Sequence, residues 1–336
     1  MTLSVECAIM DEASEVISRF RKAVEVDPNN GDAWYNLGIA YRDQGNLQEA
    51  SKHFTKAIEI NPNDSEAWNE LGDVFRIQGN YQGAIKSFKK AIKNDSNDAK
   101  AWINIGIVYR DQGNYSEEIC SYSNALDADP NSVYAWSNLG LAQREMGNYS
   151  EAIRIFEKVL DFNPNDTKAL VNLGISYQGQ SNYDEATRFI EKALDINPKD
   201  GFAWNSLGVI YAHLENYLKA SRYFQKAIDS NPNDPMPLRN LVAIYRKQGN
   251  ISDANKEFTK TLELNSTHAC VWNALGIVDH SQGNNAKAIE HFKKALESDP
   301  KFALAWHNLG TVYETQSNKA EAQRCFAKAK KLTQNP

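Results

Sequence analysis

The sequence has few cysteines, no long apolar run and no excess of positive charge, and each absence excludes a class of protein. Its four cysteines lie far apart and without metal-ligand spacing at Cys7, Cys120, Cys270 and Cys325. They are expected to be reduced thiols in a cytoplasmic protein. No stretch comes near the roughly 18 consecutive apolar residues of a membrane-spanning helix, so no membrane association is expected.

The charge balance argues against nucleic acid as a partner. The chain has 37 Lys and Arg residues against 43 Asp and Glu, a formal net charge of −6. Binding to a phosphate backbone is instead driven by clustered positive charge. At the N-terminus, MTLSVECAIMDEASEV has a short apolar run, but no basic segment precedes it and Asp11 and Glu12 follow it. A signal peptide is therefore not expected.

Catalytic and cofactor motifs are missing as well. The sequence holds no glycine-rich phosphate loop, no nucleophile elbow and no H-E-x-x-H metal motif. The six histidines are scattered along the chain. We therefore expect no enzymatic activity, no cofactor and no metal site.

What the sequence does contain is a repeat of 34 residues. Its seven tryptophans all fall on one 34-residue grid, at Trp34, Trp68, Trp102, Trp136, Trp204, Trp272 and Trp306. With this residue as position 4, position 8 is glycine and position 20 is alanine in eight of nine repeats, and position 16 is asparagine in all nine. The nine repeats are residues 31–64, 65–98, 99–132, 133–166, 167–200, 201–234, 235–268, 269–302 and 303–336.

Each repeat predicts two amphipathic helices. Positions 4, 7, 8 and 11 form one helical stripe, and positions 20, 24, 27 and 28 form a second. In repeat one, Gly45 is expected to end the first helix in the left-handed conformation and Asn46 to cap the second. Gly38 and Ala50 are expected to be small because two helix backbones approach closely there. One hairpin cannot bury both stripes, so successive repeats must stack.

Repeat one also carries a family pattern, W-x2-L-G-x2-Y…A-x3-F…P, in Trp34, Leu37, Gly38, Tyr41, Ala50, Phe54 and Pro62. In this pattern the chain resembles the tetratricopeptide repeat family, over more than nine-tenths of its residues. The resemblance implies an all-α fold, a right-handed α-α superhelix or solenoid of helix hairpins in one domain. It also implies a non-enzymatic scaffold that binds another protein in its groove.

The two ends of the chain depart from the pattern. Residues 1–30 keep the register and are expected to form a truncated repeat, an N-terminal cap. In repeat nine, Gln323 and Lys330 replace apolar residues, which predicts a polar outer face for the last helix.

Two interior repeats depart as well. Repeat three has Glu118 where the others have alanine. We expect its carboxylate to reach solvent, and a catalytic pair with Cys120 is the alternative. Repeat seven is expected to be the weakest-matching hairpin, and either a bend or a functional insertion point. Its unusual residues are Pro235, Pro237, Val242, Thr261 and Ser266.

Positions 2, 5, 6, 9, 12 and 13 lie opposite the packed stripe, on the face that resembles the ligand-binding groove of the family. Position 6 is asparagine in six repeats, whose amides suit the backbone of an extended peptide because they donate and accept. These are Asn36, Asn104, Asn138, Asn172, Asn240 and Asn308. Position 12 is an arginine suited to carboxylates or phosphates in Arg42, Arg76, Arg110, Arg144 and Arg246.

Two interpretations stay open for the arginines of repeats one to four. They could bind a ligand, or form a self-neutralising charge ladder with the acids nearby, the arginine of one repeat pairing with an acid of the next. Adjacent residues on a helix are not expected to face each other. The acids are Asp43, Glu66, Glu70, Asp73, Asp111 and Glu145.

Repeats five to eight differ, because their groove positions hold positive and apolar side chains and no acid. These residues are Lys168, Phe202, Val209, Met236, Arg239, Arg246, Lys247 and Ile277. Uncompensated positive charge beside exposed apolar side chains predicts a surface for an acidic, partly hydrophobic segment.

Three functions are consistent with these patterns. The first is a scaffold that binds an extended peptide segment of a partner protein. The second is a structural assembly module that self-associates through its edges or ends. The third is the partner-recognition part of a larger enzyme complex, in which another chain would hold the chemistry.

Overall fold

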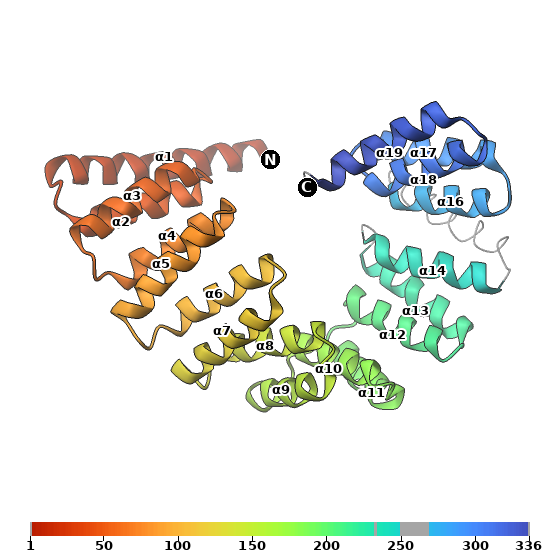
Figure 1. The fold of residues 1–336 in the computed structure, drawn as a ribbon, viewed down its shortest axis with the longest axis horizontal. Coiled ribbons are helices and arrows are strands. Elements are labelled where there is room, and N and C mark those ends of the chain that lie inside the picture. The colour runs from red at the N-terminus through yellow and green to blue at the C-terminus, as the bar shows by residue number, and fades with distance from the viewer. Residues whose placement is uncertain (1, 232–233, 249–268, 335–336) are drawn as a thin grey trace. The chain divides into compact units, whose positions relative to one another are not determined.

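The computed structural model describes residues 2–231, 234–248 and 269–334, and the side chains of residues 14–231, 234, 236–245, 247–248 and 269–333. Every element in these residues is an α-helix, as predicted (Figure 1). The chain falls into two compact units, Met1–Pro164 and Asn165–Pro336, which we call the N-terminal unit and the C-terminal unit. The prediction of one single domain stays a prediction.

The N-terminal unit holds one long helix followed by four hairpins. The long helix is α1 (Thr2–Val26). The first helices of the hairpins are α2 (Gly31–Asp43), α4 (Ser65–Ile77), α6 (Ala99–Asp111) and α8 (Val133–Glu145). The second helices are α3 (Leu47–Ile60), α5 (Tyr81–Asn94), α7 (Tyr115–Ala128) and α9 (Tyr149–Phe162).

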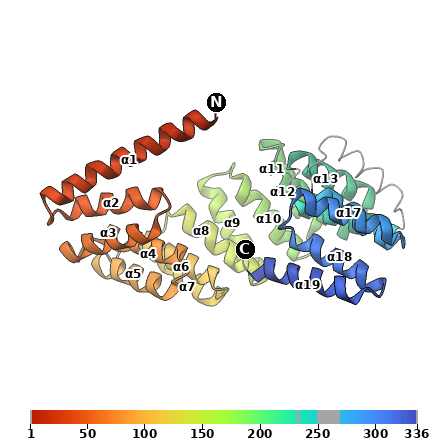
Figure 2. The ribbon, with the colours of Figure 1, turned by 90° about the horizontal axis from the view of Figure 1, so that it is seen from above.

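The C-terminal unit continues the same alternation, and in both views the helices of a hairpin lie side by side (Figures 1 and 2). Its first helices are α10 (Thr167–Gly179), α12 (Gly201–His213), α14 (Pro235–Gln248), α16 (Ala269–Ser281) and α18 (Ala303–Thr315). Its second helices are α11 (Tyr183–Ile196), α13 (Tyr217–Ser230), α17 (Asn285–Ser298) and α19 (Lys319–Gln334).

The turns inside most of the described hairpins follow the predicted chemistry, although Asn148 and Asn284 form no side-chain cap bond. Gly45 has a φ of 77°, in the left-handed region. The side chain of Asn46 accepts a hydrogen bond from the backbone N–H of Glu49 at 3.2 Å. Three repeats have another residue at the glycine position and still adopt a positive φ, namely Ser181, Glu215 and Ser317. These three positions pay a steric cost that glycine avoids.

In repeats one and two, the glycine at position 8 is small for a different reason than the sequence suggested. A Cβ added to Gly72 would lie 2.5 Å from the ring of Phe88, and one added to Gly38 would lie 2.7 Å from the ring of Phe54. Both rings are fully buried. In these two repeats the glycine therefore makes room for the aromatic ring at position 24.

In repeat five, position 24 is Ile190 instead of an aromatic residue. A Cβ on Gly174 would meet the side chain of Ile190 and would also lie 2.9 Å from the backbone oxygen of Ala186. The expected close approach of the two helix backbones therefore holds there.

Five of the seven tryptophans also hold the turn that precedes them, a contact that the repeat pattern alone did not reveal. The indole Nε1 of Trp34 donates to the carbonyl of Pro28 at 2.9 Å. The equivalent bonds join Trp68 to Pro62, Trp136 to Pro130, Trp204 to Pro198 and Trp306 to Pro300. The tryptophan of one repeat thus fixes the proline turn of the repeat before it.

The N-terminal segment differs from a repeat, because α1 runs without interruption from Thr2 to Val26. Asp11 and Glu12 occupy the two places where a repeat has its turn glycine and capping asparagine. Neither residue favours a left-handed turn as glycine does, so the helix continues. Ile17 and Val24 are buried in the core that repeat one contributes to.

Some of the other predicted departures from the repeat pattern lie within the described residues. Gln323 and Lys330 of α19 are exposed, as expected for a polar outer face. Helix α14 starts at Pro235, where a helix tolerates proline. Residues 249–268 of repeat seven, which include Thr261 and Ser266, lie outside the described residues.

Candidate functional site

The arginines at position 12 of the N-terminal unit contact acids. Arg42 forms ion pairs with Glu70 of the next repeat and, at 2.8 Å, with its neighbour Asp43. Arg76 lies 3.3 Å from Asp111 of the next repeat. The contact between Arg42 and Asp43 corrects the expectation that adjacent residues do not meet, because the long arginine side chain folds back along its helix.

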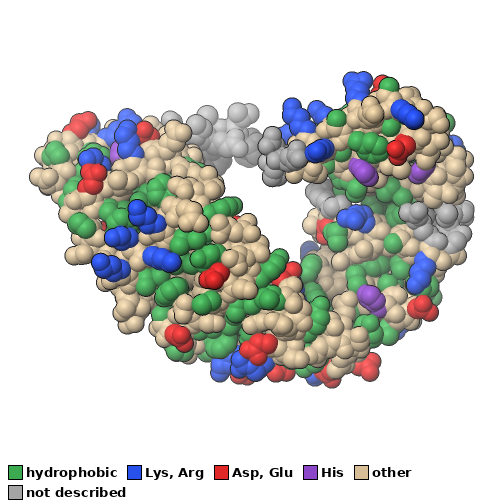
Figure 3. Space-filling view, viewed as in Figure 1, with side chains coloured by type: hydrophobic (Ala, Val, Ile, Leu, Met, Phe, Trp, Pro, Cys, Tyr) green, Lys and Arg blue, Asp and Glu red, His purple; other side chains and the backbone are tan. Residues whose placement is uncertain are grey.

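The same network extends through the following repeats. Glu70, only 9% exposed, also pairs with Lys100 at 3.4 Å, so one carboxylate joins three repeats. Arg110 donates to Asn138 Oδ1 at 3.0 Å, and Arg144 pairs with Glu145 at 2.6 Å. Basic and acidic side chains accordingly lie interspersed on the face of the N-terminal unit seen in Figure 3. The contacts of Arg42, Arg76 and Arg144 are those of a self-neutralising charge network, whereas Arg110 contacts a neutral amide.

The asparagines at position 6 form hydrogen bonds within the chain. In Asn36, Asn138 and Asn172 the amide donates to the backbone carbonyl four residues earlier, at 2.8–2.9 Å. Asn240 and Asn308 instead donate across to an asparagine of the preceding first helix, Asn205 and Asn273, each at 2.9 Å. These bonds fix the orientation of each amide.

Two of these asparagines are less accessible than the sequence suggested. Asn104 is 9% exposed and Asn138 only 5%. Both lie in the N-terminal unit, on α6 and α8, so a groove-facing role fits them less well than it fits the half-exposed Asn240 and Asn308.

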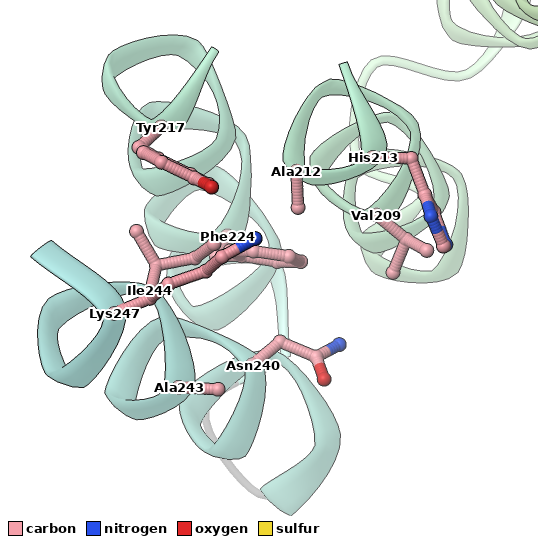
Figure 4. A pocket seen from close by; sticks show the side chains of 9 residues that line it. All are labelled: Val209, Ala212, His213, Tyr217, Phe224, Asn240, Ala243, Ile244 and Lys247. Carbon is pink, nitrogen blue, oxygen red and sulfur yellow. The ribbon is translucent and has the colours of Figure 1, made fainter. Parts of the chain in front are cut away.

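The C-terminal unit has a pocket of about 280 Å³ between α12, α13 and α14 (Figure 4). Its apolar lining comes from Val209, Ala212, Phe224, Ala243 and Ile244, and its polar lining from His213, Tyr217, Asn240 and Lys247. Among the residues predicted from sequence for the groove, Val209, Asn240 and Lys247 meet here. Ala212 was not predicted as a groove residue. Its position holds arginine in five other repeats, so the small side chain could have indicated an open space there.

Lys247 stands at the polar side of this pocket, next to Tyr217 and Glu215. Its ammonium lies 5.2 Å from the centre of the Tyr217 ring and 3.7 Å from a carboxylate oxygen of Glu215. The Tyr217 hydroxyl, and then Glu215, raise the pKa of Lys247, which is therefore protonated at neutral pH. The expectation of uncompensated charge is wrong for Lys247, because Glu215 reaches it from the turn, outside the groove positions.

Of the remaining predicted residues of the C-terminal unit, Asn172, Asn308 and Ile277 are half-buried. Ile277 packs against the core, so the expectation of an exposed apolar side chain is wrong for Ile277.

The other remaining residues of this unit with described side chains are exposed. Phe202 is 54% and Met236 47% exposed, and Arg239 lies with its guanidinium 3.7 Å from the sulfur of Met236. Lys168 is also exposed, and among the described residues neither it nor Arg239 forms an ion pair. The side chain of Arg246 lies outside the described residues.

Glu118 is buried, which corrects the expectation that its carboxylate reaches solvent. It is only 1% exposed. Burial raises its pKa to about 7, although Arg110 opposes the shift. Cys120 is exposed, so the two side chains do not form one catalytic site.

The described residues contain neither a metal cluster nor a membrane-spanning helix. No group of three or more His, Cys, Asp and Glu side chains is placed to hold a metal ion. In the same residues, no helix combines the length and the apolar character needed to cross a lipid bilayer.

Models of one family match most of the chain, under the descriptions "Tetratricopeptide repeat" and "TPR repeat". The matched segments are 31–64, 53–86, 72–113, 107–147, 133–166, 166–233, 278–317 and 303–336. These segments leave out residues 234–277, in agreement with the prediction that repeat seven matches most weakly. No curated protein matches the chain.

Many solved structures have a similar fold, among them three with TM-scores above 0.5. A tetratricopeptide repeat protein from Parabacteroides merdae is 23% identical with a TM-score of 0.52, covering 74% of this chain and 98% of that one. The C-terminal part of a TPR repeat-containing protein from Cytophaga hutchinsonii is 18% identical with a TM-score of 0.58, covering 68% and 95%. The structure of pilF from Pseudomonas aeruginosa is 22% identical with a TM-score of 0.53, covering 65% of this chain and 97% of that one. By its repeats and its fold, this chain belongs to the tetratricopeptide repeat family.

Proposed function

We propose that this chain is a protein-binding scaffold that holds an extended, acidic and partly hydrophobic segment of a partner through the first helices of its C-terminal unit. Tetratricopeptide repeat proteins generally bind protein or peptide partners. The observation that carries the proposal is the pocket between α12, α13 and α14, which combines an apolar lining with a protonated lysine.

The charges of the two units support this choice of surface. In the N-terminal unit, Arg42 and Arg76 already contact carboxylates of the next repeat. In the C-terminal unit, Lys168 and Arg239 are exposed and form no ion pair among the described residues. An acidic ligand gains more from cations that lack a carboxylate partner, because it does not have to displace one.

The apolar and amide groups of the same helices suit an extended chain. Phe202 and Met236 are large and about half exposed, which is typical of contact residues at an interface. Asn240 and Asn308 each have one amide hydrogen held by a neighbouring asparagine, so their orientation is set before a ligand binds. Preorganised groups lose less entropy on binding.

Selection from a library of short random peptides on the purified chain tests the proposal. We expect the selected peptides to be rich in Asp and Glu and to contain large apolar residues. Fluorescence anisotropy should show that Arg239→Glu with Lys247→Glu weakens their binding at least about tenfold, because both cations become repulsive.

The matched control is Lys86→Glu with Lys90→Glu, two exposed lysines one turn apart on α5. This change alters the net charge equally and should leave the affinity within about twofold. Both double variants should keep the helical circular dichroism of the unaltered chain. Selected peptides that are neutral or basic, or equal losses from both charge reversals, would sink the proposal.

A further inference from the structure

We propose that position 12 of the repeat decides whether the space between two successive first helices is closed. Ala212 leaves this space open as a pocket for one aromatic side chain, next to a carboxylate of the same ligand. The inference rests on the proposed function, because that side chain would belong to the bound acidic segment.

In the N-terminal unit, two arginines at position 12 extend into this space. Arg42 reaches from position 12 of repeat one to Glu70 at position 6 of repeat two. Arg110 makes the same step from repeat three to Asn138 of repeat four, at 3.0 Å. In both places the arginine spans the distance between one first helix and the next.

The C-terminal unit has the same two positions without the arginine. Ala212 is position 12 of repeat six and Asn240 is position 6 of repeat seven, and both line the pocket. Alanine is the smallest residue found at position 12, where the other repeats have arginine or Gln178, His280 and Glu314. The pocket therefore occupies the place of a side chain that repeat six lacks.

The size and the lining of the pocket fit an aromatic ring. Phe224 and Ile244 are 1% and 6% exposed and form an apolar wall, with Val209 opposite them on α12 (Figure 4). An apolar cavity of about 150 Å³ is already large enough to bind benzene. The volume here is about 280 Å³, which accommodates a ring and the start of a peptide backbone.

Lys247, at the rim of the pocket, already contacts a carboxylate of the chain itself. Glu215 places an oxygen 3.7 Å from the ammonium of Lys247, and both side chains are exposed, at 75% and 61%. This pair is loose and solvated, so an acidic ligand can replace Glu215 at little cost. In a ligand whose aromatic residue is flanked by Asp or Glu, the ring would fill the pocket while the neighbouring carboxylate pairs with Lys247.

The probes for a test are labelled pentapeptides of sequence Asp-Glu-X-Glu-Asp, in which X is Phe or Ala. We expect the full chain to bind the Phe peptide about tenfold more tightly than the Ala peptide. Ala212→Leu fills the pocket with apolar atoms and Ala212→Arg restores the arginine of repeats one and three. Both should reduce this ratio to about one, while Ala212→Ser, a small residue, should keep it.

A second probe, 3-phenylpropionate, reports on the pocket without a peptide. It should shift the methyl resonances of Ala212 and Ile244, and the shift of Ile244 should vanish in Ala212→Leu. If acidic peptides bind but the Phe to Ala ratio is near one, or the ratio survives Ala212→Leu, the pocket assignment is wrong and the proposed function stands. If no pentapeptide binds while 3-phenylpropionate shifts Ile244, the proposed function fails and the pocket assignment stands. If neither probe binds, both are overturned.

Discussion

At the scale of single residues, Glu118 is a carboxyl group buried where the other repeats have alanine. Burial of its carboxyl group outweighs the opposing effects on its pKa of Arg110 and of the Tyr122 hydroxyl, which lies one turn further along α7. A buried acid favours its neutral form, in line with a pKa raised from 4.5 to about 7. The N-terminal unit should therefore lose stability as pH rises.

The sign of this pH dependence follows from proton binding. Between pH 4.5 and about 7 the folded chain holds a proton on Glu118 that the unfolded chain has released. Stability thus falls as pH rises through this window, by on the order of 2 to 3 kcal/mol in total.

Glu118→Ala should remove this loss, since alanine fits position 20 in every other repeat. Thermal unfolding followed by circular dichroism should show a higher melting temperature for this variant at pH 8, and a smaller gain at pH 5. A variant that is equally or less stable than the original at pH 8 would contradict the account.

Glu215 is a second residue with a local cost, because its φ of 56° lies in the left-handed region. Glycine occupies this place in other repeats, so Glu215→Gly should stabilise the C-terminal unit by about 1 kcal/mol. The same change removes the carboxylate next to Lys247, so binding of an acidic peptide should become tighter as well.

The control for this prediction is Ser181→Gly, which replaces another residue with a positive φ, 62°, in the same turn position of repeat five. It should raise the melting temperature to a similar extent and leave peptide affinity unchanged. Equal effects of both variants on affinity would show that Glu215 does not compete for Lys247.

At the scale of helices and turns, most of the fold could be predicted from the sequence, and the reason is the regular spacing. Position 16 predicted the caps, and Asn46 caps α3. The spacing of residues in the sequence could not predict contacts that depend on the position of the end of a long side chain. The bond from Trp34 to the Pro28 carbonyl and the contact of Arg42 with Asp43 belong to this kind.

The uninterrupted helix α1 was missed for a related reason. Register alone carried the repeat pattern into residues 1–30, but the turn needs particular residues, and Asp11 and Glu12 do not supply them. The pocket was only half predicted, because Val209, Asn240 and Lys247 were named from their groove positions and Ala212 was not. Candidate ligand-binding residues are chosen for the groups they offer to a ligand, and alanine offers no polar or large apolar group.

The fit of one ring against one glycine gives a prediction at this scale. Gly72→Ala should destabilise its hairpin by about 1 to 3 kcal/mol, because the new Cβ would lie 2.5 Å from the Phe88 ring. Gly31→Ala is the control, since its Cβ would meet its nearest neighbour, a side-chain carbon of Ile60, at an ordinary 3.5 Å. Urea unfolding of both variants measures the difference, and comparable midpoints would refute the steric role of Gly72.

At the scale of the whole molecule, the repeated arginine has different partners in different repeats. In the N-terminal unit it joins successive repeats, through Arg42 with Glu70 and through Arg76 with Asp111. In the C-terminal unit the same place in repeat six holds Ala212 and opens into a pocket. One repeat pattern thus gives arginines paired with acids in one unit and an open pocket in the other, where we propose that an acidic ligand binds.

The location of a bound peptide tests this division most directly. A pentapeptide Asp-Glu-X-Glu-Asp with the photoreactive residue p-benzoylphenylalanine at X can be cross-linked to the full chain by light, and the modified residues identified by mass spectrometry. The account predicts cross-links to α12 and α14, at residues such as Val209 and Ile244, and their loss in Ala212→Leu. Cross-links concentrated on α2, α4, α6 or α8 of the N-terminal unit, and unaffected by Ala212→Leu, would contradict it.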